Sequence, residues 1–132
     1  MRVVILRLGS GMMQRIHSLV AVVPCNNLDV SEAFYARLGF TERLGEHRYD
    51  EYRMLSDGQG GEIHLTRAVD GWLVPGRNPF AIYLYTEKVD ELASSFGCKA
   101  EDKPWGTYEF GVSDPDETLV RVGWPTRLRG KR

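Results

Sequence analysis

The chain has 132 residues, a length typical of one domain, and its hydrophobic and charged fractions of 42% and 27% are those of an ordinary globular protein. A formal net charge of −1 argues against a general binder of nucleic acid or of acidic membranes. Two cysteines are too few for a disulfide scaffold, which favours a reducing, cytoplasmic setting, and no apolar run reaches the ~20 residues of a membrane span.

The first half of the chain predicts an extension followed by a β-α-β-β-β module. Residues 1–15 are expected to be an N-terminal extension, because they hold one short apolar run and no convincing signal-peptide cleavage site. The module spans residues 16–67, and its helix is expected to begin at a cap, Asn27 or Asp29, and to stop at Gly39. Its expected elements are the strand Ile16–Val23, broken by Pro24, the helix Leu28–Leu38, and the strands Phe40–Leu44, Tyr49–Leu55 and Glu62–Thr66.

The second half predicts a linker, a second module and a basic tail. Residues 68–79 are rich in Gly and Pro and are expected to be the linker. The module spans residues 80–124 and repeats the order of the first. Its expected elements are the strand Phe80–Tyr85, the helix Glu87–Phe96, a short strand Cys98–Glu101, and the strands Thr107–Val112 and Thr118–Trp124. Residues 125–132 are expected to be a solvated terminus, with a phosphate contact as the alternative.

A stretch of sequence that occurs twice accounts for this repetition. Leu55–Leu65 aligns without a gap with Val112–Val122, at an offset of 57 residues, and each copy holds a Ser-Asp turn between two strands. Two copies with so long a period indicate a duplicated α+β module and exclude a solenoid. His64 and Arg121 occupy equivalent positions in the two copies.

Alternation along the strands separates a core face from an open face. The aliphatic side chains are expected under the helices; they are Ile63, Leu65, Ile82, Leu84, Val120 and Val122. The opposite face is polar and aromatic, and it comprises Glu62, His64, Thr66, Ala81, Tyr83, Tyr85, Leu119 and Arg121. Such a face is either ordinary solvated sheet or the lining of a cleft, and its appearance in both halves favours the cleft.

Two polar residues of this face are candidate ligand-binding residues. Arg121 is a fork donor suited to a carboxylate, phosphate or sulfate, and the alternative is an internal ion pair with Glu109 or Glu62. His64 can hydrogen-bond or titrate near neutral pH, and the alternative is an ordinary sheet histidine whose hydrogen bonds are satisfied.

Aromatic residues complete the predicted site. Tyr83, Tyr85 and Trp105 offer rigid amphipathic walls, although Trp105 could equally plug the core. Trp72 in the linker is either a lid or a cover for a sheet edge. Two further members match across the repeat and share the parity of the cleft if Leu55 and Val112 are core; they are Tyr52 and Glu109.

Two motifs resemble a known superfamily. Pro24–Phe40, with its Phe-Tyr pair and Leu-Gly-Phe exit, resembles the opening helix of the glyoxalase, bleomycin-resistance and extradiol-dioxygenase superfamily, also called vicinal oxygen chelate proteins. Pro104–Phe110, followed by the Asp-Pro-Asp run that starts at Asp114, resembles the closing signature of its bleomycin-resistance-like branch. The resemblance covers about residues 16–124. It implies two β-α-β-β-β modules whose sheets curl around a cleft, usually in a homodimer.

The resemblance also implies four positions that hold a divalent metal in the enzymes of the superfamily. Carried onto this chain, they are Val20, His64, Ala81 and Arg121. Val and Ala have no donor atom and Arg stays protonated, so only His64 could bind a metal. His17 has the wrong strand parity and His47 lies in a predicted turn, so neither is expected to complete the set.

The residues and the resemblance together predict a metal-independent small-molecule-binding protein of the bleomycin-resistance type. It would sequester an antibiotic-like compound, aromatic or of the glycopeptide type, in clefts formed with a dimer partner, and no cofactor is expected. Its near-neutral charge and Arg121 favour an anionic or neutral aromatic ligand over cationic bleomycin itself. One alternative is a metal-dependent lyase, isomerase or dioxygenase, or a metal-free acid/base enzyme that uses His64 with Glu62 or Glu109. Another is a structural dimer module with a vestigial cleft.

Overall fold

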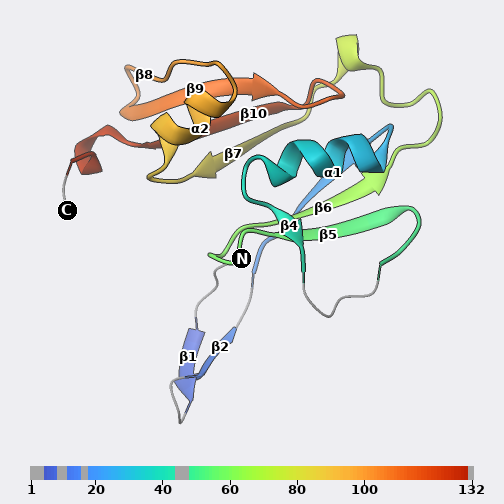
Figure 1. Cartoon of the computed structure of the whole chain (residues 1–132), viewed down its shortest axis with the longest axis horizontal. Coiled ribbons are helices and arrows are strands. Elements are labelled where there is room, and N and C mark those ends of the chain that lie inside the picture. Colours follow the sequence, from blue (N-terminus) through green and yellow to red (C-terminus); the bar gives the residue numbers. More distant parts are fainter. Residues whose placement is uncertain (1–4, 9–11, 16–17, 44–47, 131–132) are drawn as a thin grey trace. The chain divides into compact units, whose positions relative to one another are not determined.

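The computed structural model describes residues 5–8, 12–15, 18–43 and 48–130 (Figure 1). The chain forms two compact units, residues 1–70 and 71–132. Both units contain a β-α-β-β-β module with a mixed four-stranded sheet. The predicted α+β architecture of two such modules is therefore confirmed. No helix in the described part of the chain is long and apolar enough to cross a membrane.

The first unit begins with a two-stranded antiparallel hairpin that the sequence analysis did not predict, formed by β1 (Ile5–Leu8) and β2 (Met12–Arg15). The module follows, with strand order β3-β6-β5-β4, and β3 and β6 run parallel. Its elements are β3 (Ala21–Cys25), α1 (Leu28–Ala36), β4 (Thr41–Glu42), β5 (Tyr52–Ser56) and β6 (Glu62–Arg67).

The second unit repeats this topology with the order β7-β10-β9-β8, and β7 and β10 run parallel. Helix α2 lies over β9 and β10 (Figure 1). Its elements are β7 (Ala81–Tyr85), α2 (Val89–Ser95), β8 (Glu101–Asp102), β9 (Thr107–Ser113) and β10 (Leu119–Pro125). Short 3-10 helices precede and follow the module, at η1 (Pro75–Arg77) and η2 (Thr126–Leu128).

The ends of α1 follow from its capping residues. Asn27 is the N-cap, and its side-chain oxygen accepts a hydrogen bond from the backbone N–H of Val30 at 3.1 Å. After α1 the backbone turns, and Gly39 adopts a φ of 96°, which favours glycine. The helix thus ends two residues before the predicted Leu38.

Two predicted strands were wrong in part. Strand β3 starts at Ala21 and continues through Pro24 to Cys25, because β3 is an edge strand of its sheet and there Pro loses no ladder hydrogen bond. The strand expected over Cys98–Glu101 is only the two-residue β8, since the backbone N–H of Cys98 is bound to the carbonyl of Ala93 at the end of α2. The predicted start of β3 at residue 16 and the predicted strand end at residue 44 lie outside the described residues.

The repeated Ser-Asp turns are built in the same way in both units. Asp57 Oδ1 accepts hydrogen bonds from the backbone N–H groups of Gln59 and Gly61, at 2.8 and 2.9 Å. At the equivalent positions, 57 residues on, Asp114 Oδ1 accepts from Asp116 and Thr118, also at 2.8 and 2.9 Å. One carboxylate therefore fixes each turn and with it the register of the following strand.

Strand alternation predicted the core of β6 and β10 correctly, whereas Ile82 and Leu84 of β7, which were also expected in the core, are only half-buried. In β6 and β10 the four predicted aliphatic residues are at most 4% exposed; they are Ile63, Leu65, Val120 and Val122. The residues between them, His64 and Arg121, lie on the opposite, open faces and are partly exposed. Glu62 departs from the pattern, because its side chain is buried although it was expected on the polar face.

The C-terminal tail is not the free, solvated end that was expected. The guanidinium of Arg129 lies 3.4 Å above the ring of Tyr108 and within 4.0 Å of carboxylate oxygens of Asp90 and Asp102. The Tyr108 hydroxyl in turn donates a hydrogen bond to Asp90. These contacts fasten the tail, up to Arg129, to β9 and α2 of the second unit.

Candidate functional site

A buried carboxylate organises the open face of the second sheet. Glu109 lies in the middle of β9, and its side chain is only 4% exposed. Its Oε1 atom accepts three hydrogen bonds, from Thr107 Oγ1 at 2.5 Å, Tyr83 Oη at 2.7 Å and Trp105 Nε1 at 3.2 Å. One carboxylate thus orients a tyrosine from β7 and a tryptophan from the turn before β9.

The surroundings of Glu109 keep it ionised. Burial by itself would raise the pKa of this carboxyl, but the hydrogen bonds from Thr107, Tyr83 and Trp105 and the charge of Arg121 lower it overall. Burial, together with the adjacent carboxylate, raises the pKa of the Tyr83 hydroxyl. At neutral pH the tyrosine is therefore a hydrogen-bond donor and Glu109 is an acceptor.

Arg121 forms an internal ion pair and is also available to bind an anion, which are the two roles that the sequence left open. Its NH1 atom lies 3.7 Å from Oε2 of Glu109, so an ion pair exists, but the distance is longer than a hydrogen bond. The side chain is 46% exposed. The guanidinium can therefore accept a further anionic partner without giving up its neighbour.

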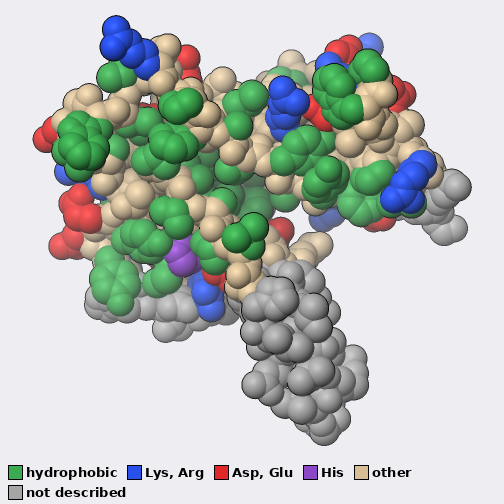
Figure 2. Space-filling view, turned by 180° about the vertical axis from the view of Figure 1, so that it is seen from behind, with side chains coloured by type: hydrophobic (Ala, Val, Ile, Leu, Met, Phe, Trp, Pro, Cys, Tyr) green, Lys and Arg blue, Asp and Glu red, His purple; other side chains and the backbone are tan. Residues whose placement is uncertain are grey.

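Two tyrosines and a tryptophan present apolar surface beside this charged pair. The rings of Tyr83 and Tyr85 lie 4.6 Å apart, and Tyr85 is 59% exposed. Trp105 is 61% exposed although its indole N–H is bound to Glu109, so it does not plug the core as one alternative had it. Exposed apolar side chains of this kind are drawn in green in Figure 2. Such rings offer rigid contact area to an aromatic ligand.

Gly123 leaves the space through which the hydroxyl of Tyr83 reaches the carboxylate of Glu109. It lies in β10 opposite Glu109 and beside Tyr85. A Cβ atom at this position would lie 2.2 Å from the hydroxyl oxygen of Tyr83 and 2.9 Å from Cβ of Glu109. Only a glycine leaves room for the hydroxyl to pass over β10.

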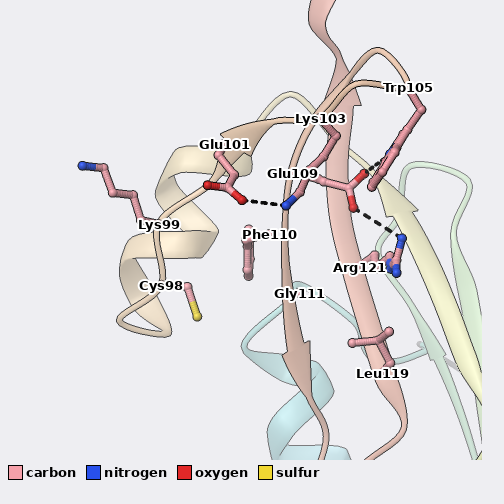
Figure 3. A pocket seen from close by; sticks show the side chains of 10 residues that line it. All are labelled: Cys98, Lys99, Glu101, Lys103, Trp105, Glu109, Phe110, Gly111, Leu119 and Arg121. Atoms are coloured by element: carbon pink, nitrogen blue, oxygen red, sulfur yellow. Dashed lines mark hydrogen bonds and ion pairs between the residues drawn. The ribbon is translucent and has the colours of Figure 1, made fainter.

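A pocket of about 450 Å³ opens next to Glu109, within the second unit (Figure 3). Glu109 and Gly111 of β9 form its floor, and Leu119 and Arg121 of β10 lie on one side. The lining residues on the other side, toward α2, are Cys98, Lys99, Glu101, Lys103 and Phe110. Trp105 closes one end. The lining holds three cationic side chains and two carboxylates, and the carboxylate of Glu101 is paired with Lys103 at 2.6 Å.

The open face of the first sheet carries a different cluster. The hydroxyl of Tyr52 lies 2.7 Å from Nδ1 of His64. On the other side of the ring, Nε2 is buried and has no hydrogen-bond partner, with Oε1 of Glu62 at 3.5 Å. Arg43 binds that same oxygen at 3.0 Å, which explains how Glu62 can be buried. The imidazole is thus held by a neutral partner and faces a paired carboxylate.

The architecture of this chain is similar to that of several solved structures. No family model matches the chain, and no curated protein matches it. Among solved structures, a bleomycin-binding protein complexed with bleomycin superposes with a TM-score of 0.69 at 21% identity, covering 82% of this chain and 98% of that one. A bleomycin resistance determinant encoded on the transposon Tn5 gives a TM-score of 0.69 at 23% identity, covering 83% and 98%. The chain has the glyoxalase/bleomycin-resistance fold. A lactoylglutathione lyase from Agrobacterium tumefaciens shares it, with a TM-score of 0.62 at 20% identity, covering 87% and 97%.

The glyoxalase/bleomycin-resistance fold was thus correctly predicted from the two motifs, and the metal that enzymes of this superfamily hold can be tested against the residues present. Of the four implied positions, Val20, Ala81 and Arg121 supply no ligand atom. His64 already engages Tyr52 through Nδ1. Within residues 18–43 and 48–130, no three His, Cys, Asp or Glu side chains are grouped so that they could hold a metal ion. The donor set does not fit a metal centre of the superfamily. His17 and His47 lie outside the described residues.

The structure brings most of the predicted site residues together within each unit. Tyr83, Trp105, Glu109 and Arg121 form one cluster, which Tyr85 extends. Tyr52 and His64 form the other. Trp72 is 80% exposed and is not part of the pocket lining, so no contact supports a role in the pocket.

Several residues that the site depends on were not predicted from the sequence. Thr107 and Gly123 were not singled out, although Thr107 lies two residues before Glu109 and so shares its face, which was a usable signal. Gly123 interrupts an apolar strand, where glycine often marks a close approach. The pairing of Arg43 with Glu62 spans 19 residues and left no signal in the pattern.

Proposed function

We propose that this protein is a metal-independent small-molecule-binding protein of the bleomycin-resistance type, and that its ligand is an anionic or neutral aromatic compound. The observation that carries this proposal is the Glu109 cluster, in which one buried carboxylate orients Tyr83 and Trp105 beside the half-exposed Arg121. Binding of a flat ligand needs rigid apolar walls and a few polar anchors, and this cluster supplies both.

The cost of binding supports the same proposal. Side chains that must be immobilised on association lose conformational freedom, at about 0.5–1.5 kcal/mol each. Tyr83 and Trp105 are already fixed by their hydrogen bonds to Glu109. The guanidinium of Arg121 provides a fork of donors that matches a carboxylate. The cluster is therefore pre-organised toward an aromatic anion.

The proposal extends to assembly and location. Several large apolar side chains of the second unit are exposed in the single chain, among them Trp72 at 80%, Phe80 at 50% and Tyr85 at 59%. We propose that a homodimer covers part of this surface. Light scattering after gel filtration tests this, and a monomer at micromolar concentration would contradict it. We also propose a cytoplasmic location, because two cysteines in a chain of 132 residues are too few for a disulfide scaffold.

Thermal unfolding with added ligands tests the binding function. A panel of neutral and anionic aromatic compounds is compared with bleomycin, the ligand in the complex of the structurally similar protein. We expect stabilisation by members of the panel, none by bleomycin, and loss of the response in Trp105→Ala. Stabilisation by bleomycin alone would contradict the proposed ligand class, because Arg121 would repel that cation.

A second candidate function is metal-free proton transfer by His64. It is favoured by the buried Nε2 atom, which lies 3.5 Å from a carboxylate oxygen of Glu62 and has no hydrogen-bond partner. His64→Gln separates the two functions. We expect ligand binding by the second unit to persist in this variant, whereas an enzyme would lose turnover.

A further inference from the structure

The two sheets are related by the repeat, yet at two positions of the open face the second sheet has a glycine where the first has a larger side chain. Where the first sheet has Met54 and Thr66, the second has Gly111 and Gly123, 57 residues on. Gly123 makes room for the hydroxyl of Tyr83. Gly111 lies in β9 directly opposite Arg121, just as Met54 lies in β5 directly opposite His64.

The backbone at Gly111 does not require a glycine. Its φ is not in the positive range, and a Cβ atom would meet its nearest neighbour, Cδ1 of Leu119, at 3.4 Å. Glycine inside a strand weakens that strand, since it has no side chain to pack and loses more conformational freedom on folding. What the glycine provides is space: it forms the floor of the 450 Å³ pocket, beside Glu109.

The groups around this floor define what the space can hold. Leu119 and the indole of Trp105 supply apolar surface, and Arg121 supplies a cation that is only loosely paired, at 3.7 Å from Glu109. Lys103 is engaged by Glu101 at 2.6 Å. Figure 3 shows Lys99 directed away from the other lining side chains. Arg121 is therefore the cation best placed to meet an anion above Gly111.

We propose that Gly111 is the specificity-determining residue of a subsite for flat aromatic carboxylates. The ring lies over Gly111 between Trp105 and Leu119, and the carboxylate pairs with the guanidinium of Arg121. This inference rests on the proposed function and adds to it the ligand class and the position that admits the ligand. A methionine at this position, as in the first sheet, would occupy the floor of the pocket.

The test uses three probes of similar size and different charge: 2-naphthoate, 2-naphthylmethanol and 2-naphthylmethylammonium. Calorimetric titration measures their affinity for the full chain. We expect 2-naphthoate to bind at least about tenfold more tightly than the alcohol, and the amine not to bind.

Two reciprocal variants separate the pocket from the fold. Gly111→Met copies the first sheet and should weaken 2-naphthoate binding by at least about 100-fold while the protein stays folded, because a side chain is compatible with the strand. Met54→Gly makes the opposite exchange in the first sheet and should leave binding unchanged. Gly111→Ala offers a smaller change if Gly111→Met fails to fold, and it should weaken binding to an intermediate degree.

The outcomes distinguish this inference from the proposed function. If 2-naphthoate binds and neither Gly111→Met nor Gly111→Ala weakens its binding, the pocket assignment is overturned and the binding function stands. If the alcohol or the amine binds as well as the acid, the assigned ligand class is overturned. If no aromatic compound binds the wild-type protein, the proposed function fails and the subsite fails with it.

Discussion

The hydroxyl of Tyr52 lies 2.7 Å from Nδ1 of His64, on the two positions that correspond in the repeat to Glu109 and Arg121. In the second sheet the charged groups at those positions lie 3.7 Å apart. Both pairs are diagonal neighbours on adjacent antiparallel strands, where long side chains can meet. The two pairs thus have the same relative position in their sheets but interact differently. Tyr52 and His64 form a neutral hydrogen bond, whereas Glu109 and Arg121 form an ion pair.

The hydrogen bond in the first sheet should contribute measurably to stability. Tyr52→Phe removes the hydroxyl and leaves the ring, so we expect the free energy of unfolding to fall by about 1 kcal/mol. Urea denaturation at constant pH measures the difference. Tyr85→Phe is the control, since that side chain is 59% exposed and should give no change beyond ~0.5 kcal/mol. Equal losses in both variants would contradict the contact.

Replacement of two neighbouring glycines of the second sheet by alanine should change the stability of the protein by different amounts. At Gly123 an added Cβ would lie 2.2 Å from the Tyr83 hydroxyl, so Gly123→Ala must displace that ring and should cost about 1–3 kcal/mol. At Gly111 the nearest atom is 3.4 Å away, so Gly111→Ala should be nearly neutral or stabilising. Thermal unfolding of both variants provides the comparison. Combining Gly123→Ala with Tyr83→Phe should recover part of the loss, and an equal cost at both glycines would contradict the packing described.

Period-two alternation and the repeat predicted the two β-α-β-β-β modules and the buried faces of β6 and β10, although not the bounds of β3 and β8 or the β1–β2 hairpin. The burial of Ile63, Leu65, Val120 and Val122 and the openness of the opposite faces follow from side-chain parity alone. Parity also placed Tyr52 and Glu109 on the open faces, where they lie beside His64 and Arg121. What could not be predicted depends on contacts between distant segments. Arg43 buries Glu62, Arg129 fastens the tail to Tyr108, and the backbone N–H of Cys98 is taken by α2 instead of a strand.

The lowered pKa of Glu109 predicts a specific pH dependence. A carboxyl whose pKa is lower in the folded protein than its ordinary value of 4.5 stabilises the fold above that value, and the contribution is lost as the pH falls through the folded pKa. Stability of the wild type should therefore decline below about pH 4.5. Glu109→Gln should cost about 1–3 kcal/mol at pH 7 and flatten the decline.

Urea midpoints between pH 3 and pH 7 measure this effect. The control is Glu87→Gln, an exposed carboxylate, which should retain the wild-type slope. A Glu109→Gln variant with an unchanged acid slope would show that other carboxylates carry the pH dependence.

The contact between the tail and β9 predicts a small, specific loss of stability. Arg129 lies over the ring of Tyr108, so Arg129→Ala removes a cation–π contact and should cost about 0.5–1 kcal/mol. Arg129→Lys should restore only part of this, because an ammonium lacks the planar stacking surface. Arg127→Ala is the matched control, an exposed arginine in the adjoining 3-10 helix. Equal effects of the two alanine variants would indicate a general charge effect instead of the contact.

The side chains at the four metal-binding positions of the superfamily predict that this protein binds no metal ion and that metal ions do not change its stability. Two of the four have no donor atom, one is a guanidinium, and His64 is engaged by Tyr52. We therefore expect no stoichiometric metal in elemental analysis of protein purified without added metal. Its melting temperature should be the same in chelator and in excess Mn²⁺, Fe²⁺, Zn²⁺ or Ni²⁺. A metal at 100 times its dissociation constant would add about 2.7 kcal/mol to the free energy of unfolding, which thermal unfolding detects readily. His64→Ala is the control: a metal response that disappears in this variant would show that His64 is a ligand after all, and would favour a metal-dependent enzyme over the binding protein proposed for this chain.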